Sequence, residues 1–145
     1  VLAALITLTV GCAATAQERR YEVVVKPMSS ESGFEKVKVS KAALGSTQIM
    51  LWRNAAINPD CTAVDGVTLS ILRPPEHGKA TVSDEPLYAA YPPANPRSAC
   101  NNRKVPGHQA FYQADAGFTG HDTLVLQGSS PEGRVRQITV DILVR

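Results

Sequence analysis

Apolar and polar residues alternate along most of this chain after residue 17, and helical spacing is hard to find there. The longest alternating run closes the chain, with apolar side chains at Ile138, Val140, Ile142 and Val144. A period of two places successive side chains on opposite faces of a strand, so each such run can bury one face. The pattern therefore predicts an all-β protein.

Turn residues divide the alternation into short strands. We expect strands at residues 21–26, 36–40, 49–52, 67–71, 80–82, 110–114, 124–126 and 138–144. The prolines and glycine of residues 74–78 predict a hairpin turn between the fourth and fifth of these strands, and residues 41–44 predict a single helical turn before Gly45. Seven to nine short strands without helices predict an antiparallel, immunoglobulin-like β-sandwich.

The first seventeen residues carry no charge and are rich in Val, Leu, Ile and Ala. The apolar run of residues 1–10 has the length of a signal-peptide core and is shorter than the roughly 20 residues that span a bilayer. Because residues 14–16 read Ala-Thr-Ala, a pattern suited to cleavage, we predict a signal peptide over residues 1–16 and a mature domain over 17–145 that is periplasmic or secreted.

Two other fates of the N-terminal segment stay open. One is a membrane anchor. The other is lipidation, because Val10-Gly11-Cys12 resembles the lipobox of bacterial lipoproteins, in which Cys12 would carry the lipid. Contact with a membrane is expected only if Cys12 is lipidated.

The charge is nearly balanced, with 15 basic and 13 acidic residues among 145 and a formal net charge of +2. This balance gives no electrostatic reason to expect a nucleic acid or an anionic membrane surface as partner. A hydrophobic content of 43% is that of an ordinary globular domain of this length. We therefore expect one domain that does not bind nucleic acid.

Two cysteines, Cys61 and Cys100, follow the predicted signal peptide. An even pair in an exported protein favours a disulfide, which the chain-entropy model values at about 4 kcal/mol for a loop of this size. A thiolate nucleophile or metal ligand would instead need a reducing compartment or a Cys-x-x-Cys motif. The predicted disulfide would hold a long insertion against the sandwich.

That insertion covers residues 84–108, where five prolines prevent long strands or helices. It is longer than an ordinary connection, and loops of this kind are often functional. Its candidate partner-binding residues are Tyr88, Tyr91, Arg97, Arg103 and Lys104. The alternative is that the tyrosines fold back as a plug over the end of the sandwich while the basic side chains are solvated.

The second half of the chain contains a recognisable order of turns and strands. Its signals are Pro75 to Gly78, Tyr112, the corner Gly117-Phe118-Thr119-Gly120-His121-Asp122, and the strands ending at Leu126 and Val144. This order resembles the bacterial immunoglobulin-like and cadherin-like repeats of cell-surface proteins, over about residues 67–145. The resemblance implies a role at the cell surface. Calcium is not expected, because the acidic motifs of true cadherins are absent.

The corner itself has a physical explanation. Gly117 and Gly120 permit the backbone angles of a tight corner, Phe118 can plug the end of the core, and Asp122 can accept hydrogen bonds from the corner amides. We expect these residues to form a structural corner. Trp52 is likewise expected to be a core residue.

Three histidines, His77, His108 and His121, raise the alternative of a metal site. The expected fold places His108 at the end of the sandwich opposite the other two, about 17–20 Å away along a strand of five or six residues. We therefore expect no metal and no cofactor. Carboxylates at Asp60, Asp65, Asp84 and Glu85 are expected near the disulfide, as solvated or capping groups.

No familiar catalytic motif is present: Gly-x-Ser-x-Gly, His-Glu-x-x-His, Cys-x-x-Cys and glycine-rich phosphate loops are all missing. We therefore expect a non-enzymatic, exported module that binds a protein or has a structural role in the bacterial envelope. Its partner would be an envelope protein or a cell-surface component. A small periplasmic metal-binding protein and an enzyme of unfamiliar type remain alternatives.

Overall fold

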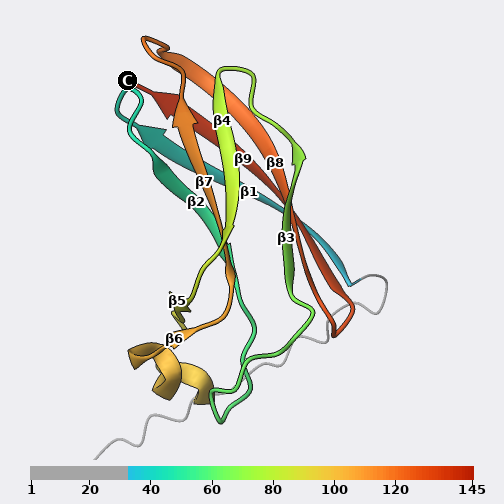
Figure 1. Ribbon diagram of the computed structural model, residues 1–145. Helices are drawn as coiled ribbons and strands as arrows, with labels where there is room; N and C mark the ends of the chain where they lie inside the picture. The colour runs from blue at the N-terminus through green and yellow to red at the C-terminus, as the bar shows by residue number, and fades with distance from the viewer. Residues whose placement is uncertain (1–32) are drawn as a thin grey trace, which may run out of the picture.

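The computed structural model describes residues 33–145 (Figure 1). The predicted signal peptide, Cys12 and the strand expected at residues 21–26 lie outside this range. The elements are β1 (Phe34–Ala43), β2 (Ile49–Asn54), β3 (Thr68–Arg73), β4 (Gly78–Asp84), β5 (Leu87–Tyr88), the 3₁₀ helix η1 (Pro96–Asn102), β6 (Lys104–Val105), β7 (His108–Ala114), β8 (Gly120–Ser130) and β9 (Arg134–Val144). The prediction of an all-β protein is confirmed.

Seven of these strands form two facing sheets. The strand order is β1-β9-β8-β3 in one sheet and β2-β7-β4 in the other. In an immunoglobulin-like sandwich these groups correspond to the C-F-G and B-E-D strands, with the first strand placed beside the last one. The predicted sandwich is therefore confirmed.

One pair of strands departs from the antiparallel prediction. β1 runs parallel to β9, from Phe34 opposite Val135 to Ala43 opposite Val144. A parallel pair needs a long connection, and these two strands are joined by almost the whole described chain. Alternation within a strand does not encode the direction of its neighbour, so the sequence pattern could not reveal this pair.

The core lies between the two sheets. Its buried members come from both: Leu51 on β2, Ala110, Tyr112 and Ala114 on β7, Leu124 and Leu126 on β8, and Ile138, Val140, Ile142 and Val144 on β9. The four apolar side chains of the closing strand are at most 1% exposed. Each fully buried aliphatic side chain contributes about 1.5–3 kcal/mol, so the alternating runs supply the main stabilisation of the sandwich. Trp52 packs against this core, as predicted.

The helical turn expected at residues 41–44 is wrong. β1 continues to Ala43, which is only 3% exposed, and the chain turns at Gly45, where φ is +52°. The ladder pairs residues 41–43 with residues 142–144 of β9, so the tertiary pairing outweighs the local helical preference.

The hairpin expected around residues 74–78 is also wrong. β3 pairs with β8, whereas β4 pairs with β7 in the opposite sheet. The segment between them crosses from one sheet to the other, and Pro74 and Pro75 in it have no N–H with which to continue a ladder. Both strands alternate as predicted, but their partners lie elsewhere in the chain.

The connections gather at two ends of the sandwich (Figure 1). The corner end carries the turns at residues 74–77 and 115–119, and the insertion end carries the loop at residues 55–67 and the insertion of residues 84–108. This separation agrees with the expectation from the sequence. In the described part of the chain, no helix has the length and apolar character needed to cross a membrane.

Candidate functional site

At the corner end, Asp122 is the centre of a buried hydrogen-bond cluster. The residue is 4% exposed, and its carboxylate accepts bonds from the backbone N–H groups of Glu76 and His77 at 3.0 Å each, from Thr123 N–H at 2.9 Å and from the Tyr112 hydroxyl at 3.0 Å. Two of these donors belong to the connection between β3 and β4, not to the corner amides that were expected. Asp122 therefore links the β3–β4 connection to β7 and β8.

The environment shifts the pKa values of both side chains in this cluster. Burial by itself raises the pKa of Asp122, but the hydrogen bonds from Glu76, His77, Tyr112 and Thr123 outweigh burial and lower it below its usual value. Burial, together with the hydrogen bond to the Asp122 carboxylate, raises the pKa of Tyr112 well above its usual value. The pair is thus held as a carboxylate and a neutral phenol, which is the state that supports the corner.

The remaining corner residues lie on the connection between β7 and β8 and at the start of β8. Gly117 and Gly120 adopt φ values of +81° and +125°, which favour glycine. Phe118 packs against the core and stacks on the His77 ring, with centroids 4.4 Å apart. His121 lies 3.5 Å from the Asp141 carboxylate. Among the described residues, no group of three potential ligands is placed to hold a metal ion.

At the insertion end, residues 84–108 and the loop at residues 55–67 build a small second core. Its buried members are Ile57, Leu87, Cys100 and Val105, which we call the second cluster. β5 and β6 form a short antiparallel ladder within the insertion. Cys61 and Cys100 are joined by the predicted disulfide, with their Cα atoms 5.4 Å apart, and the bridge ties η1 to the loop at residues 55–67.

Two polar side chains add to this attachment. Arg97 Nε donates a hydrogen bond of 2.6 Å to the carbonyl oxygen of Ile57, which links η1 to the loop at residues 55–67. Asn101 Oδ1 accepts a bond of 3.0 Å from Tyr91 N–H, and Asn101 Nδ2 donates one of 2.9 Å to Tyr91 O. The segment from Leu87 to Tyr91 is therefore fixed to η1.

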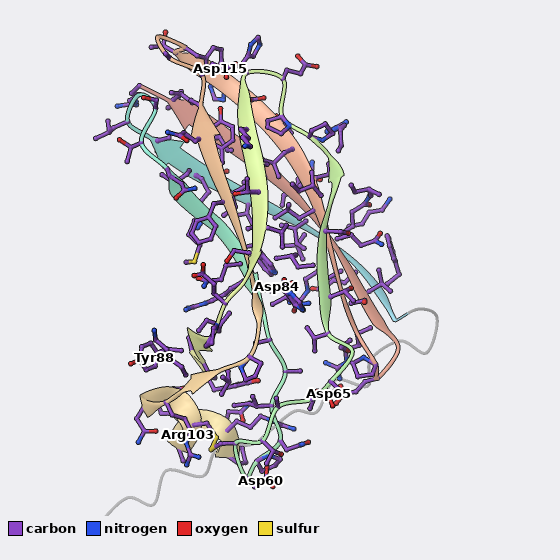
Figure 2. All side chains as sticks on the ribbon, viewed as in Figure 1. Asp60, Asp65, Asp84, Tyr88, Arg103 and Asp115 are labelled. Carbon is purple, nitrogen blue, oxygen red and sulfur yellow. A yellow bond between two sulfur atoms is a disulfide. The ribbon has the colours of Figure 1, made fainter. Side chains whose placement is uncertain are left out.

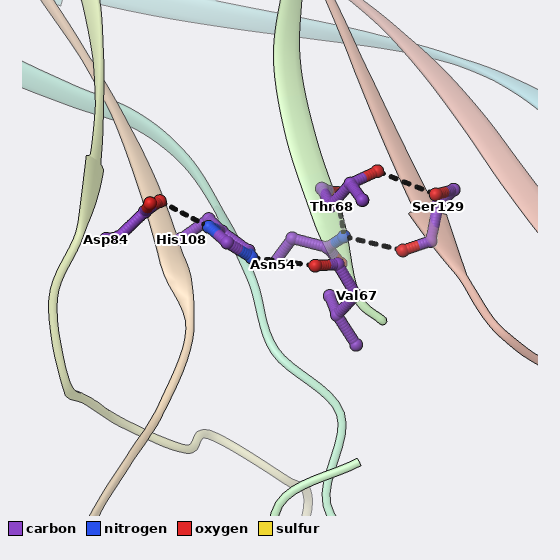
Figure 3. A network of polar contacts seen from close by, with 6 residues as sticks. All are labelled: Asn54, Val67, Thr68, Asp84, His108 and Ser129. Atoms are coloured by element: carbon purple, nitrogen blue, oxygen red, sulfur yellow. Dashed lines mark hydrogen bonds and ion pairs between the residues drawn. The ribbon is translucent and has the colours of Figure 1, made fainter. Parts of the chain in front are cut away.

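A polar network joins the two sheets above the insertion (Figure 3). The His108 ring bonds to the Asp84 carboxylate through Nδ1 and to the carbonyl oxygen of Val67, at 2.7 Å, through Nε2. Asn54 Nδ2 donates to the carbonyl oxygens of Thr68, at 2.7 Å, and Ser129, at 3.3 Å. No sequence pattern pointed to this network, because its partners are distant in the chain.

The two predicted tyrosines have different roles. Tyr91 is partly buried and packs against the second cluster. Tyr88 is 53% exposed, and Lys104 Nζ lies 5.8 Å from the centre of its ring. Arg53 Nη1 donates to the carbonyl oxygen of Tyr88 at 3.5 Å. Tyr88 is therefore the aromatic side chain of the insertion that faces solvent.

A groove of about 220 Å³ runs beside Tyr88, and we call it the insertion groove. Its walls are the end of β2 with the residues that follow, Arg53, Ala55 and Ile57, and the segment from Leu87 to Tyr91 with Val105. A second hollow of about 280 Å³, the carboxylate cleft, is lined by Asp65, Asp84, Glu85 and His108 among others. Of the expected carboxylate group, Asp60 lies apart and caps Thr62.

No family model matches the chain, and no curated protein matches it. Among solved structures, the chain is similar to the solution structure of amebosin, at 16% identity and a TM-score of 0.40, covering 77% of this chain and 98% of that one. It is similar to the same degree to the crystal structure of a cysteine protease inhibitor from Entamoeba histolytica, at 15% identity and a TM-score of 0.40, covering 77% of this chain and 95% of that one.

Proposed function

We propose that this protein is an exported, non-enzymatic immunoglobulin-like module that binds an envelope or cell-surface protein through its insertion. The observation that carries the proposal is the exposure of Tyr88 on a segment that is fixed in place. Its neighbours Leu87 and Val105 are buried in the second cluster, and η1 holds the end of the segment through Asn101. An exposed aromatic ring on a rigid support is well suited to a partner.

The physical reason is entropic. A tyrosine brings a large contact area but only two side-chain torsions, so little conformational freedom is lost when a partner covers it. A backbone that is already ordered adds no further ordering cost on binding. Lys104 supplies a charged group over the ring, and Arg103 precedes it in the chain. These features together support a binding surface at Tyr88, Arg103 and Lys104.

The disulfide supports the proposed location in the envelope. A bridge between Cys61 and Cys100 is typical of oxidising surroundings, such as the periplasm or the extracellular space. An envelope location agrees with the apolar N-terminal segment expected to act as an export signal. Lipidation of Cys12 would keep the same module at a membrane surface.

Site-specific photo-crosslinking in living cells tests the proposal. A photoreactive phenylalanine analogue is placed at Tyr88 of the full chain, and in a control at Lys38, an exposed residue of β1. We expect a discrete crosslinked species at position 88 and none at position 38. Equal crosslinking at both positions, or none at position 88, would reject the insertion as the binding surface.

A further inference from the structure

The insertion separates charges of opposite sign onto its two sides. Arg53 lines the insertion groove, and Lys104 reaches over the Tyr88 ring beside it. On the other side, Asp65 and Asp84 line the carboxylate cleft. Figure 2 shows this division, with Tyr88 and Arg103 on the left of the insertion and Asp84 and Asp65 on the right. Among the described residues, none that lines the insertion groove is acidic.

The separation follows from the short β5–β6 ladder. Pro86 and Pro106, just outside the ladder, line the carboxylate cleft, whereas Leu87 and Val105, which pair within it, line the insertion groove. On each strand, two consecutive residues therefore line different hollows. Each hollow has its own chemistry, although both belong to the same insertion.

The insertion groove has an apolar floor. Ile57, Leu87 and Val105 are 2%, 6% and 2% exposed and contribute to its lining, together with alanines and the two tyrosines. Its volume of about 220 Å³ exceeds the apolar cavity of about 150 Å³ that accommodates benzene in another protein. One aliphatic side chain of a partner therefore fits in it.

We propose that the insertion groove binds a peptide segment of the partner in which one aliphatic side chain is flanked by carboxylates. The proposal rests on the binding function given above and specifies the partner's chemistry. The aliphatic side chain fills the apolar floor, and the flanking carboxylates pair with Arg53, Arg103 and Lys104. A basic segment meets like charges at the groove, so complementary charge selects the acidic one.

Nuclear magnetic resonance titration of the uniformly labelled protein with synthetic peptides tests this. The probes are acetyl-Glu-Asp-Leu-Asp-Glu-amide, the same peptide with Gly in place of Leu, and acetyl-Lys-Lys-Leu-Lys-Lys-amide. We expect the first peptide to shift the backbone amide signals of residues 87–91 in a saturable way. The glycine and lysine peptides are expected to bind at least about tenfold more weakly.

A pair of matched double variants tests which basic side chains bind the acidic peptide. The R103S/K104S variant lacks two basic side chains that pair with the peptide's carboxylates, so its affinity for the acidic peptide is expected to be about threefold to tenfold lower than that of wild type. Added salt should reduce this difference. K36S/K38S removes two exposed lysines from β1 and should leave the affinity unchanged. Circular dichroism melting confirms that both variants are folded.

Three results would overturn the assignment: equal binding of the acidic and basic peptides, shifts confined to the carboxylate cleft, or no saturable shift at millimolar acidic peptide. Each is distinguishable from failure of the proposed function. If crosslinks still form at Tyr88 while the acidic peptide does not bind, the insertion is a binding surface with a partner of different chemistry. If crosslinks also fail there, the binding function itself is rejected.

Discussion

The Tyr112 hydroxyl donates a hydrogen bond of 3.0 Å to Oδ2 of Asp122, across the core between β7 in one sheet and β8 in the other. Both side chains are buried, and the same carboxylate accepts the N–H groups of Glu76 and His77. One ionised group therefore connects the two sheets and the β3–β4 connection. The corner end depends on its charge and on the geometry of its oxygens.

Asp122→Asn is expected to lower the free energy of unfolding by about 2–3 kcal/mol, because an amide NH₂ would face N–H donors that now meet a carboxylate oxygen. Urea denaturation measures the loss. Asp115→Asn is the matched control, since Asp115 is an exposed carboxylate at the same end (Figure 2), and it should change stability by less than about 0.5 kcal/mol. Equal effects of the two substitutions would show that the cluster is not a stabilising centre.

Acid should remove the contribution of Asp122. The folded state lowers the pKa of Asp122, so this group stabilises the protein above its unfolded pKa of about 3.9. The stabilisation is lost as the pH falls through the folded pKa. The stability difference between wild type and Asp122→Asn should therefore be constant from pH 7 to 5 and shrink below about pH 4. Thermal melts at a series of pH values provide the test, and a constant difference down to pH 2 would contradict it.

Tyr112→Phe measures the contribution of the Tyr112 hydroxyl to stability. The substitution keeps the ring in the core but removes one donor to a buried carboxylate, which is expected to cost about 1.5–3 kcal/mol. The folded state raises the pKa of Tyr112, so its contribution is present below the unfolded value of about 10 and is lost as the pH rises through the folded pKa. Denaturation at pH 7 and pH 11 should show a smaller alkaline loss for the variant than for wild type. If the variant and wild type lose the same stability between pH 7 and pH 11, another group causes the alkaline loss.

Removal of the disulfide should affect the insertion more than the sandwich. The bridge closes a separation of 39 residues, for which chain entropy predicts up to about 4 kcal/mol. Because Cys100 belongs to the second cluster and Cys61 packs against it, away from the main core, Cys61→Ser/Cys100→Ser should increase hydrogen exchange chiefly at residues 96–105. Exchange in β8 and β9 serves as the internal reference. Uniform acceleration in all strands would mean that the insertion and the sandwich unfold as one unit.

Asn101→Ala should loosen the wall of the insertion groove. The substitution removes both hydrogen bonds to the backbone of Tyr91, so the amides of residues 88–91 should exchange with solvent several-fold faster. Asn102→Ala, at the exposed neighbouring position, is the control and should leave exchange unchanged. If both variants behave like wild type, the β5–β6 ladder alone is sufficient to order the segment.

The candidate site was predictable only in part. Cysteine parity indicated the bridge between Cys61 and Cys100, and the density of prolines marked the insertion. Composition could not separate Tyr88, which faces solvent, from Tyr91, which packs inward, because the difference depends on which of the two rings packs against the second cluster in the tertiary structure. The bond from Arg97 Nε to the carbonyl of Ile57 was not predictable either, because the two residues are 40 positions apart in the chain.

The sequence by itself determined that the chain forms strands and which face of most strands is buried, because alternation is a local property and burial of apolar area follows it. The alternation predicts that Ile138 and Val140 face the core, and both are fully buried. Only the tertiary structure decided that β1 runs parallel to β9, that β3 and β4 belong to different sheets, and that Asp122 binds the turn before β4. Those choices depend on register and on hydrogen bonds between residues far apart in the chain, and no local pattern encodes them.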